Sequence, residues 1–202
     1  MTLWFLARAA GFMALIGATA AVSLGAIASG SAPADRLRRR ESRVLVQLAH
    51  RSAAVVTLAL LALHAVLLIL DAHVAITLPG ALVAFTAGYR AWAVGLGTLA
   101  VYCFAVVALT GAVRGRLAGS PSAARWWRPV HALAYLAWPL AMAHGLFSGT
   151  DTGTWWAWLL YGGSTLAVVT AVWVRLTAEE AHVAGPLAAR RQRHRQLAGR
   201  MS

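Results

Sequence analysis

The chain has 202 residues, of which 60% are hydrophobic and only 12% are charged, and its mean hydropathy is +0.67. These values exclude an ordinary soluble domain and a disordered chain, and they indicate several membrane spans. The formal net charge is +12, and every basic side chain is an arginine. Because the arginines cluster at the ends of apolar stretches, they indicate membrane topology and a lipid bilayer partner rather than a nucleic-acid partner.

Five apolar stretches are long enough to cross a bilayer, which takes about 20 residues. They run over residues 3–28, 44–70, 92–113, 129–147 and 155–174. We expect the first to be a retained helix, because its apolar run is longer than that of a signal peptide and Arg8 is its only charge. The segment 71–91 contains Pro79 and Gly80 and is too interrupted to span, which favours an interfacial or re-entrant cap.

Loop charges predict the orientation. Arginines crowd the connections after the first and third stretches, over 36–43 and 114–128, and follow the fifth stretch. The other two connections are nearly free of arginine and carry Asp71 and Asp151. The positive-inside rule therefore places the N-terminus outside and the C-terminus in the cytoplasm. The expected fold class is an all-α bundle of about five transmembrane helices in the inner (plasma) membrane, followed by a basic cytoplasmic tail over 177–202.

Four histidines lie in the second and fourth stretches as two pairs. The spacing is i, i+14 for His50 and His64, and i, i+13 for His131 and His144. Each pair therefore spans about 20 Å of helix. Both helices run from inside to outside, so His50 is expected to face His131 and His64 to face His144. On an ideal helix the i+14 position returns within about 40° of one face, whereas i+13 misses it by about 140°, which calls for irregular winding near Pro139.

Ordinary interhelical hydrogen bonds are one explanation of these histidines. Ionisable groups inside a membrane are costly and usually functional, so four of them at matched depths favour ligation of two haems. The only cysteine is Cys103, and the sequence has no CxxCH motif for covalent attachment. Two alternatives remain: a transporter whose histidines bind metal or relay protons, and a non-catalytic membrane anchor of a flavoprotein complex.

The segments HRSAAVVTLALLALH and WRPVHALAYLAWPLAMAHG resemble the two ligand helices of the ferric reductase-like transmembrane domain superfamily, which includes ferric reductases and NADPH oxidases. The resemblance covers about residues 3–175 and implies such a domain over 1–176. It also implies two b-type haems whose axial iron ligands are His50, His64, His131 and His144. The flavin and nicotinamide domains of the larger enzymes are missing, so the chain is expected to be an oxidoreductase component. Its electron donor is expected to be a separate flavoprotein, reductase or quinol, and flavin or quinone would enter through that partner.

Further candidates are expected to support the haems. Arg51, next to His50, and Arg8 in the first span are candidates to pair with haem propionates, because arginine forms forked hydrogen bonds with carboxylates. Snorkelling to lipid headgroups is the alternative for both. Five glycines are expected to permit close approach of a helix or a haem: Gly95, Gly97, Gly111, Gly162 and Gly163. No internal repeat is apparent in the sequence.

Overall fold

The structure is a computed structural model that describes residues 2–30, 36–72, 74, 76–117 and 119–198. Within these residues the chain forms helices and no strand. The helices are α1 (Thr2–Gly30), α2 (Arg36–Leu70), α3 (Leu78–Leu82), α4 (Ala91–Leu117), α5 (Pro121–His131), α6 (Ala134–Ser148) and α7 (Trp155–Ala198).

Five of the described segments are helices long and apolar enough to cross a membrane, which agrees with the predicted number of spans. These candidate spans are Thr2–Ser29, Glu41–Leu70, Ala91–Gly115, Arg125–Ser148 and Trp155–Ala178. Many large apolar side chains point outward from them; Leu109 and Leu166, for example, are 67% and 68% exposed. Such an apolar surface is suited to contact with lipid. Helices are also suited to a lipid environment, because a helix satisfies its own backbone hydrogen bonds.

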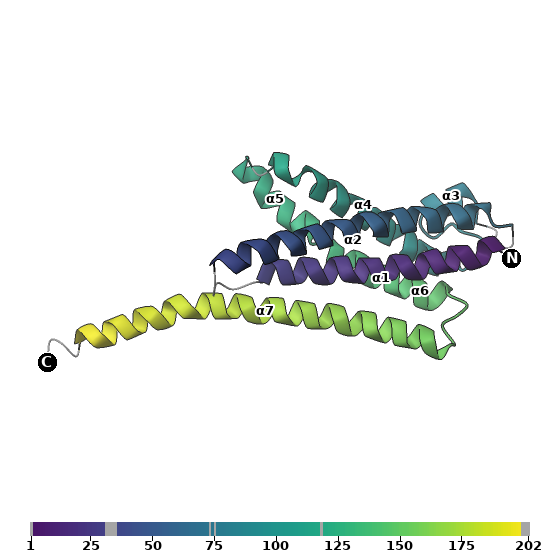
Figure 1. Ribbon diagram of the computed structural model, residues 1–202. Helices are drawn as coiled ribbons and strands as arrows, with labels where there is room; N and C mark the ends of the chain where they lie inside the picture. The colour runs from purple at the N-terminus through teal and green to yellow at the C-terminus, as the bar shows by residue number, and fades with distance from the viewer. Residues whose placement is uncertain (1, 31–35, 73, 75, 118, 199–202) are drawn as a thin grey trace.

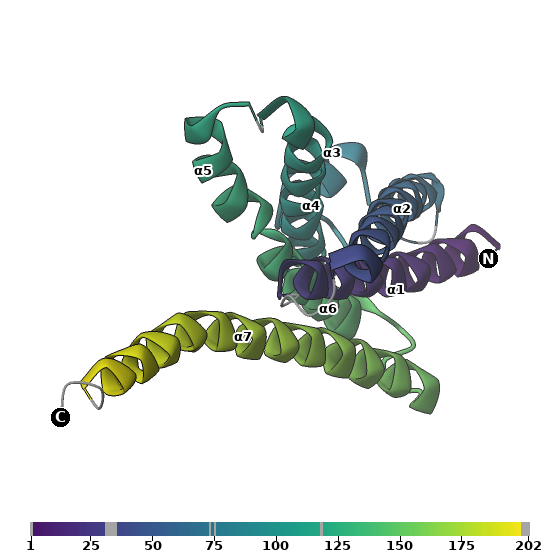
Figure 2. The same cartoon turned by 60° about the vertical axis from the view of Figure 1, so that its left-hand side comes forward.

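The long helices lie roughly side by side, with α1 and α6 at the centre (Figures 1 and 2). Helix α1 packs against α2, α6 and α7, whereas α4 packs against α5 and α6. Among the described residues, α2 and α6 make little or no direct backbone contact. The bundle therefore consists of an α1–α2 hairpin and an α4–α6 unit, joined through α1 and α6.

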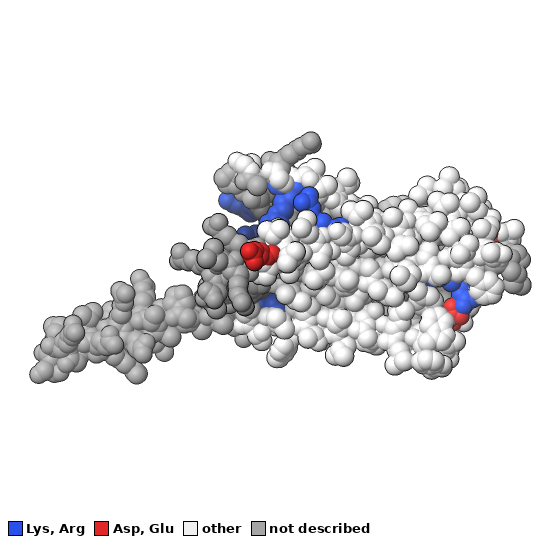
Figure 3. All heavy atoms as spheres, in the orientation of Figure 1, with Lys and Arg blue, Asp and Glu red and all other residues white. Residues whose placement is uncertain are grey.

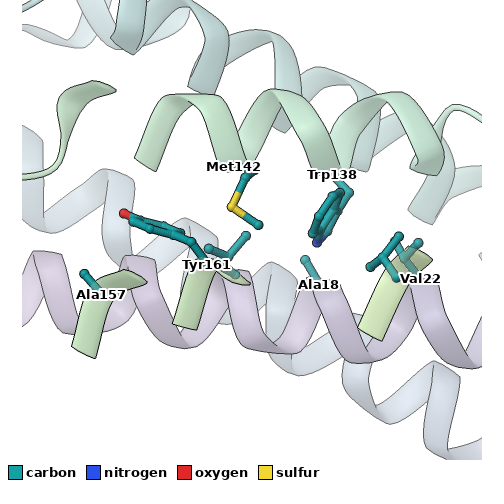
Figure 4. Packing of buried hydrophobic residues seen from close by; sticks show 8 residues of the cluster. Ala18, Val22, Trp138, Met142, Ala157 and Tyr161 are labelled. Atoms are coloured by element: carbon teal, nitrogen blue, oxygen red, sulfur yellow. The ribbon is translucent and has the colours of Figure 1, made fainter. Parts of the chain in front are cut away.

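The best-packed region of the bundle lies where α1, α6 and α7 meet (Figure 4). Its buried side chains are Leu15, Ala18, Val22, Trp138, Met142, Ala157, Tyr161 and Val168. Trp138 also donates a hydrogen bond from Nε1 to the Thr19 hydroxyl at 3.0 Å. Close packing and interhelical hydrogen bonds of this kind hold helices together in lipid, where burial of apolar surface contributes little.

The fourth span is not one continuous helix. Helix α5 ends at His131, two residues in turn conformation follow, and α6 begins at Ala134. Around this break the amides of Leu133, Tyr135 and Leu136 bond to carbonyls three residues back instead of four. Such tight turns advance the chain by about 120° per residue instead of 100°, and this recovers part of the azimuth that an ideal helix would miss between His131 and His144. The irregular winding expected at Pro139 is thus located elsewhere, because Pro139 lies inside α6.

The segment between α2 and α4 does not span, as expected. It carries the short helix α3 and forms a small apolar cluster from Val74, Ile76 and Ala87, which pack with Val94 of α4. Trp4 at the start of α1 packs against the same cluster. This segment therefore covers the end of the bundle at which α1 begins and α2 ends.

The opposite end of the bundle is basic. Figure 3 shows Lys and Arg positions gathered there, near the start of α2 and the α4–α5 connection, and since the chain has no lysine these are arginines. We call this end the arginine end. Helix α7 continues past the predicted domain boundary at residue 176 without a break, as far as Ala198. The last residues of the predicted tail, 199–202, lie outside the described part of the chain.

Candidate functional site

The four candidate histidines form the two predicted pairs. His50 on α2 faces His131 at the end of α5, with ring centroids 6.3 Å apart and ring planes 66° apart. His64 on α2 faces His144 on α6, with centroids 6.2 Å apart and planes 78° apart. Helix α2 begins at the arginine end and finishes at the end covered by the segment between α2 and α4. The first pair therefore lies nearer the arginine end and the second nearer the covered end. Both pairs bridge α2 and the α5–α6 span, the two elements that make little direct contact.

The separation within each pair is suited to a metal between two axial imidazoles. A transition metal lies about 2.0–2.1 Å from an imidazole nitrogen, and the ring centre lies about 1.1 Å behind that nitrogen, so two rings on opposite sides of one metal have centres about 6.2–6.4 Å apart. Rings that were hydrogen-bonded directly or stacked would lie closer together. The observed 6.3 and 6.2 Å are compatible with a single ion between the rings of each pair, and they also lie within the usual range of edge-to-face ring contacts.

Three of the four rings are held from behind by a backbone carbonyl. The Nδ1 atom lies 2.8 Å from the Ala21 oxygen in His50, 2.7 Å from the Ala7 oxygen in His64, and 2.8 Å from the Ala93 oxygen in His144. A carbonyl can only accept, so Nδ1 must carry the proton in each ring. The lone pair of the neutral imidazole is then on Nε2, which is the arrangement that a metal-ligating histidine requires.

His131 has two partners on α4. The Val107 carbonyl accepts a hydrogen bond from the ring, and the hydroxyl of Thr110, which donates its own proton to the same carbonyl at 2.8 Å, lies 3.4 Å from Nδ1. Trp127 stacks on the His131 ring at 4.9 Å between centroids and 20° between planes, and its Nε1 donates to the Thr110 carbonyl. The guanidinium of Arg114 lies over the Trp127 ring, 4.7 Å from its centroid.

A glycine lies against each histidine ring. A Cβ atom built on Gly97 would come within 2.7 Å of His144 Nδ1, and one on Gly11 within 2.9 Å of His64 Nδ1 and Cε1. The corresponding distances are 3.2 Å from Gly25 to His50 and 3.4 Å from Gly111 to His131. The predicted close approach occurs at Gly97 and Gly111, and also at Gly95, which lies against Phe85. The prediction is wrong for Gly162 and Gly163, where no described atom lies within 4 Å of the Cβ position. Sequence reasoning missed Gly11 and Gly25. Their separation along the chain equals that of His50 and His64, and this match is the signal that was available.

A cavity adjoins the His64–His144 pair and contains about 840 Å³ of space free of protein atoms, including the part that is open to the surroundings. Its walls are mainly apolar and come from α1, α2, α6, α7 and the capping segment. The polar side chains at its edge include Arg8, Tyr89, Ser148 and Asp151. The Ser148 hydroxyl lies 3.5 Å from His144 Nε2.

Arg8 lies where the sequence suggested, beside the outer of the predicted haem positions. It forms an ion pair with Asp151 in the α6–α7 connection, and its guanidinium lies near the Trp4 and Phe5 rings. Its Nε is buried and contacts no acceptor among the described residues. Sequence reasoning missed Asp151 as its partner. Arg51 is exposed, next to His50, and a propionate contact at either arginine remains a prediction.

No group of three or more His, Cys, Asp or Glu side chains suitable for a metal ion occurs in the described part of the chain. The four candidate histidines lie in two separate pairs. A scan of family models and searches of curated proteins and solved structures find no match to the chain. The two histidine pairs are therefore the main indication of function in this chain.

Proposed function

We propose that this protein is a di-haem, b-type electron-transfer protein of the membrane, with one haem held by His50 and His131 and a second by His64 and His144. The carrying observation is the geometry of the two pairs: ring centroids 6.3 and 6.2 Å apart, at two levels of one bundle. Haem iron with two axial imidazoles supplies one-electron redox chemistry.

The hydrogen bonds behind the rings support this assignment. Proton transport by histidines requires ring nitrogens that can gain and lose protons, whereas a carbonyl behind Nδ1 keeps one tautomer in place. This applies to His50, His64 and His144. A transporter site for a bare divalent metal needs three or four protein ligands, and the described residues offer two at each level. Both observations favour axial ligation over the transporter alternative.

The space between the ligand helices is where a flat cofactor would lie. Helices α2 and α6 face each other without packing closely among the described residues, and the cavity at the His64–His144 level opens between them and α1. An apolar lining with a cationic group at its edge suits a macrocycle that carries carboxylates. Arg8 is our candidate for a propionate contact there, because its buried Nε–H group makes no hydrogen bond within the described part of the chain.

The orientation is part of the proposal. If the arginine end faces the cytoplasm, the haem of His50 and His131 is the inner one and the haem of His64 and His144 the outer one. The two levels on α2 are separated by about 21 Å of helix. The protein would then carry electrons one at a time between a separate donor and acceptor on the two sides of the membrane.

Purification in mild detergent, followed by a reduced-minus-oxidised spectrum and a pyridine haemochrome assay, tests the proposal. We expect two b-type haems per chain. His64→Ala and His144→Ala should each remove the outer haem and leave close to half of the signal. His182→Ala is a matched control, because His182 follows the last candidate span, which ends at Ala178, and it should retain both haems.

Purified protein without b-type haem, or a full signal in both His64→Ala and His144→Ala, refutes the proposal. Specific binding of zinc or another divalent metal by haem-free protein, lost on the same substitutions, would support the transporter alternative. Haem-free protein that still captures a flavoprotein would support the membrane-anchor alternative.

A further inference from the structure

Helices α1 and α4, which carry none of the four candidate histidines, contain a repeated feature. In the four segments ARAAG (7–11), AVSLG (21–25), AVGLG (93–97) and VALTG (107–111), the first residue and the glycine are four positions apart. The first two segments lie on α1 and the last two on α4. Within each helix the two segments repeat at an i, i+14 spacing. Each glycine lies against one of the four histidine rings.

The spacing of four has a physical reason. In an α-helix the carbonyl of one residue points toward the residue four positions later, whose side chain lies over that same face. A glycine at this later position leaves the carbonyl oxygen uncovered. The oxygen has a second lone pair beyond the one used within the helix, so it can also accept a bond from a neighbouring helix. This is what the Ala7, Ala21 and Ala93 oxygens do with the histidine Nδ1 atoms.

The i, i+14 spacing matches these units to their ligands. His50 and His64 have this same spacing, and α2 runs antiparallel to α1, so both units of α1 meet a histidine in the same way. His131 and His144 are one position closer together. At the α4 unit nearest His131 the Val107 carbonyl shares the ring with the Thr110 hydroxyl, which lies 3.4 Å from Nδ1, and the Gly111 Cβ position is also 3.4 Å away.

We infer that these carbonyl–glycine units on α1 and α4 position the axial imidazoles, with Gly97 and Gly11 as the critical positioning residues for the outer haem and Thr110 as that for the inner one. The inference rests on the proposed function. A hydrogen bond from Nδ1 to an acceptor makes the imidazole more basic, and a more basic axial ligand stabilises ferric iron. Each unit therefore lowers the reduction potential of its own haem and fixes the ring azimuth.

The test uses the full-length protein in detergent, with potentiometric titration of the haem absorbance and electron paramagnetic resonance of the oxidised haems. In Gly97→Ala the added methyl must displace the His144 ring, because its Cβ would lie 2.7 Å from Nδ1. We expect the outer haem to shift to a higher potential with altered g values while the inner haem is unchanged. Gly11→Ala should act on the same haem, and Gly25→Ala should shift the inner haem less, since its contact is 3.2 Å.

Gly162→Ala is the matched control, because nothing lies within 4 Å of its Cβ position. Thr110→Val removes the hydroxyl acceptor at His131 with little change in side-chain shape, and it should raise the potential of the inner haem alone. This variant decides the question if Gly97→Ala fails to fold.

The inference is overturned if Gly97→Ala, or Thr110→Val where the former does not fold, shows the same potentials and g values as Gly162→Ala with both haems bound. It is also overturned if both haems shift equally in Gly97→Ala. These failures differ from that of the proposed function, which is a wild-type protein without b-type haem.

Discussion

Neutralising Arg8 and Asp151, singly and together, measures how strongly the start of α1 is tied to the α6–α7 connection. The two side chains form an ion pair and are 23% and 15% exposed. Exposed pairs contribute about 0–1 kcal/mol, and breaking a fully buried pair costs about 3–5 kcal/mol. At this intermediate burial we expect Asp151→Asn to lower the free energy of unfolding by about 2 kcal/mol.

Arg8→Gln should cost more than Asp151→Asn, about 3 kcal/mol, because it also removes the contacts of the guanidinium with the Trp4 and Phe5 rings. The double variant should cost about 3 kcal/mol and not the sum of about 5, since each single change already loses the pair. The coupling energy is then about 2 kcal/mol, or about 30-fold in the unfolding equilibrium constant.

Reversible unfolding in mixed detergent micelles, followed by circular dichroism and tryptophan fluorescence, gives the four free energies of this cycle. The same preparations report haem content, which controls for indirect effects through the cofactor. Additivity of the two single effects within about 0.5 kcal/mol would show that the pair is not coupled, and the reasoning from burial would be wrong.

Three further substitutions probe the site and its packing. His131→Ala should remove the inner haem and spare most of the outer one in a reduced-minus-oxidised spectrum; equal loss of both would contradict the pairing. Trp127→Leu removes the ring stacked on His131 and should change the g values of the inner haem, whereas Trp126→Leu should not, since Trp126 is 71% exposed. Gly17→Ala would bring a Cβ within 2.5 Å of Thr57 Oγ1 and should lower the thermal stability by about 1–3 kcal/mol. A second change, Thr57→Ala, should restore most of that loss, and no rescue would mean that the Gly17 contact is not the cause.

The number of spans could be predicted from the sequence because it depends on a local, additive quantity. A stretch of about 20 apolar residues is stable in lipid as a helix whatever its neighbours are, since its backbone hydrogen bonds are internal. Which histidines face each other followed from the order of spans and from loop charges, and the structure brings together His50 with His131 and His64 with His144. Haem ligation by these pairs remains the proposal that the spectra will test.

The break after His131 could not be located in the same way. Proline marks a place where a helix tends to bend, and the sequence offered both Pro129 and Pro139. The chain stays helical through Pro139 and tightens at residues 132–136. That choice depends on how α6 packs against α1 and α4, which periodicity along one segment does not contain.

The sequence by itself thus determined the long helices, their order and the positions of the four histidines along them, because hydrophobicity and charge act on each segment separately. Only the tertiary structure decided what lies behind each ring: the Ala7, Ala21 and Ala93 carbonyls, and Val107 together with the Thr110 hydroxyl at the fourth. These partners lie on other helices, and their contacts depend on the register and closeness of helix pairs to within an ångström. A glycine four residues after a carbonyl permits such a contact, but only the packing of α1 on α2 and of α4 on α6 brings it about.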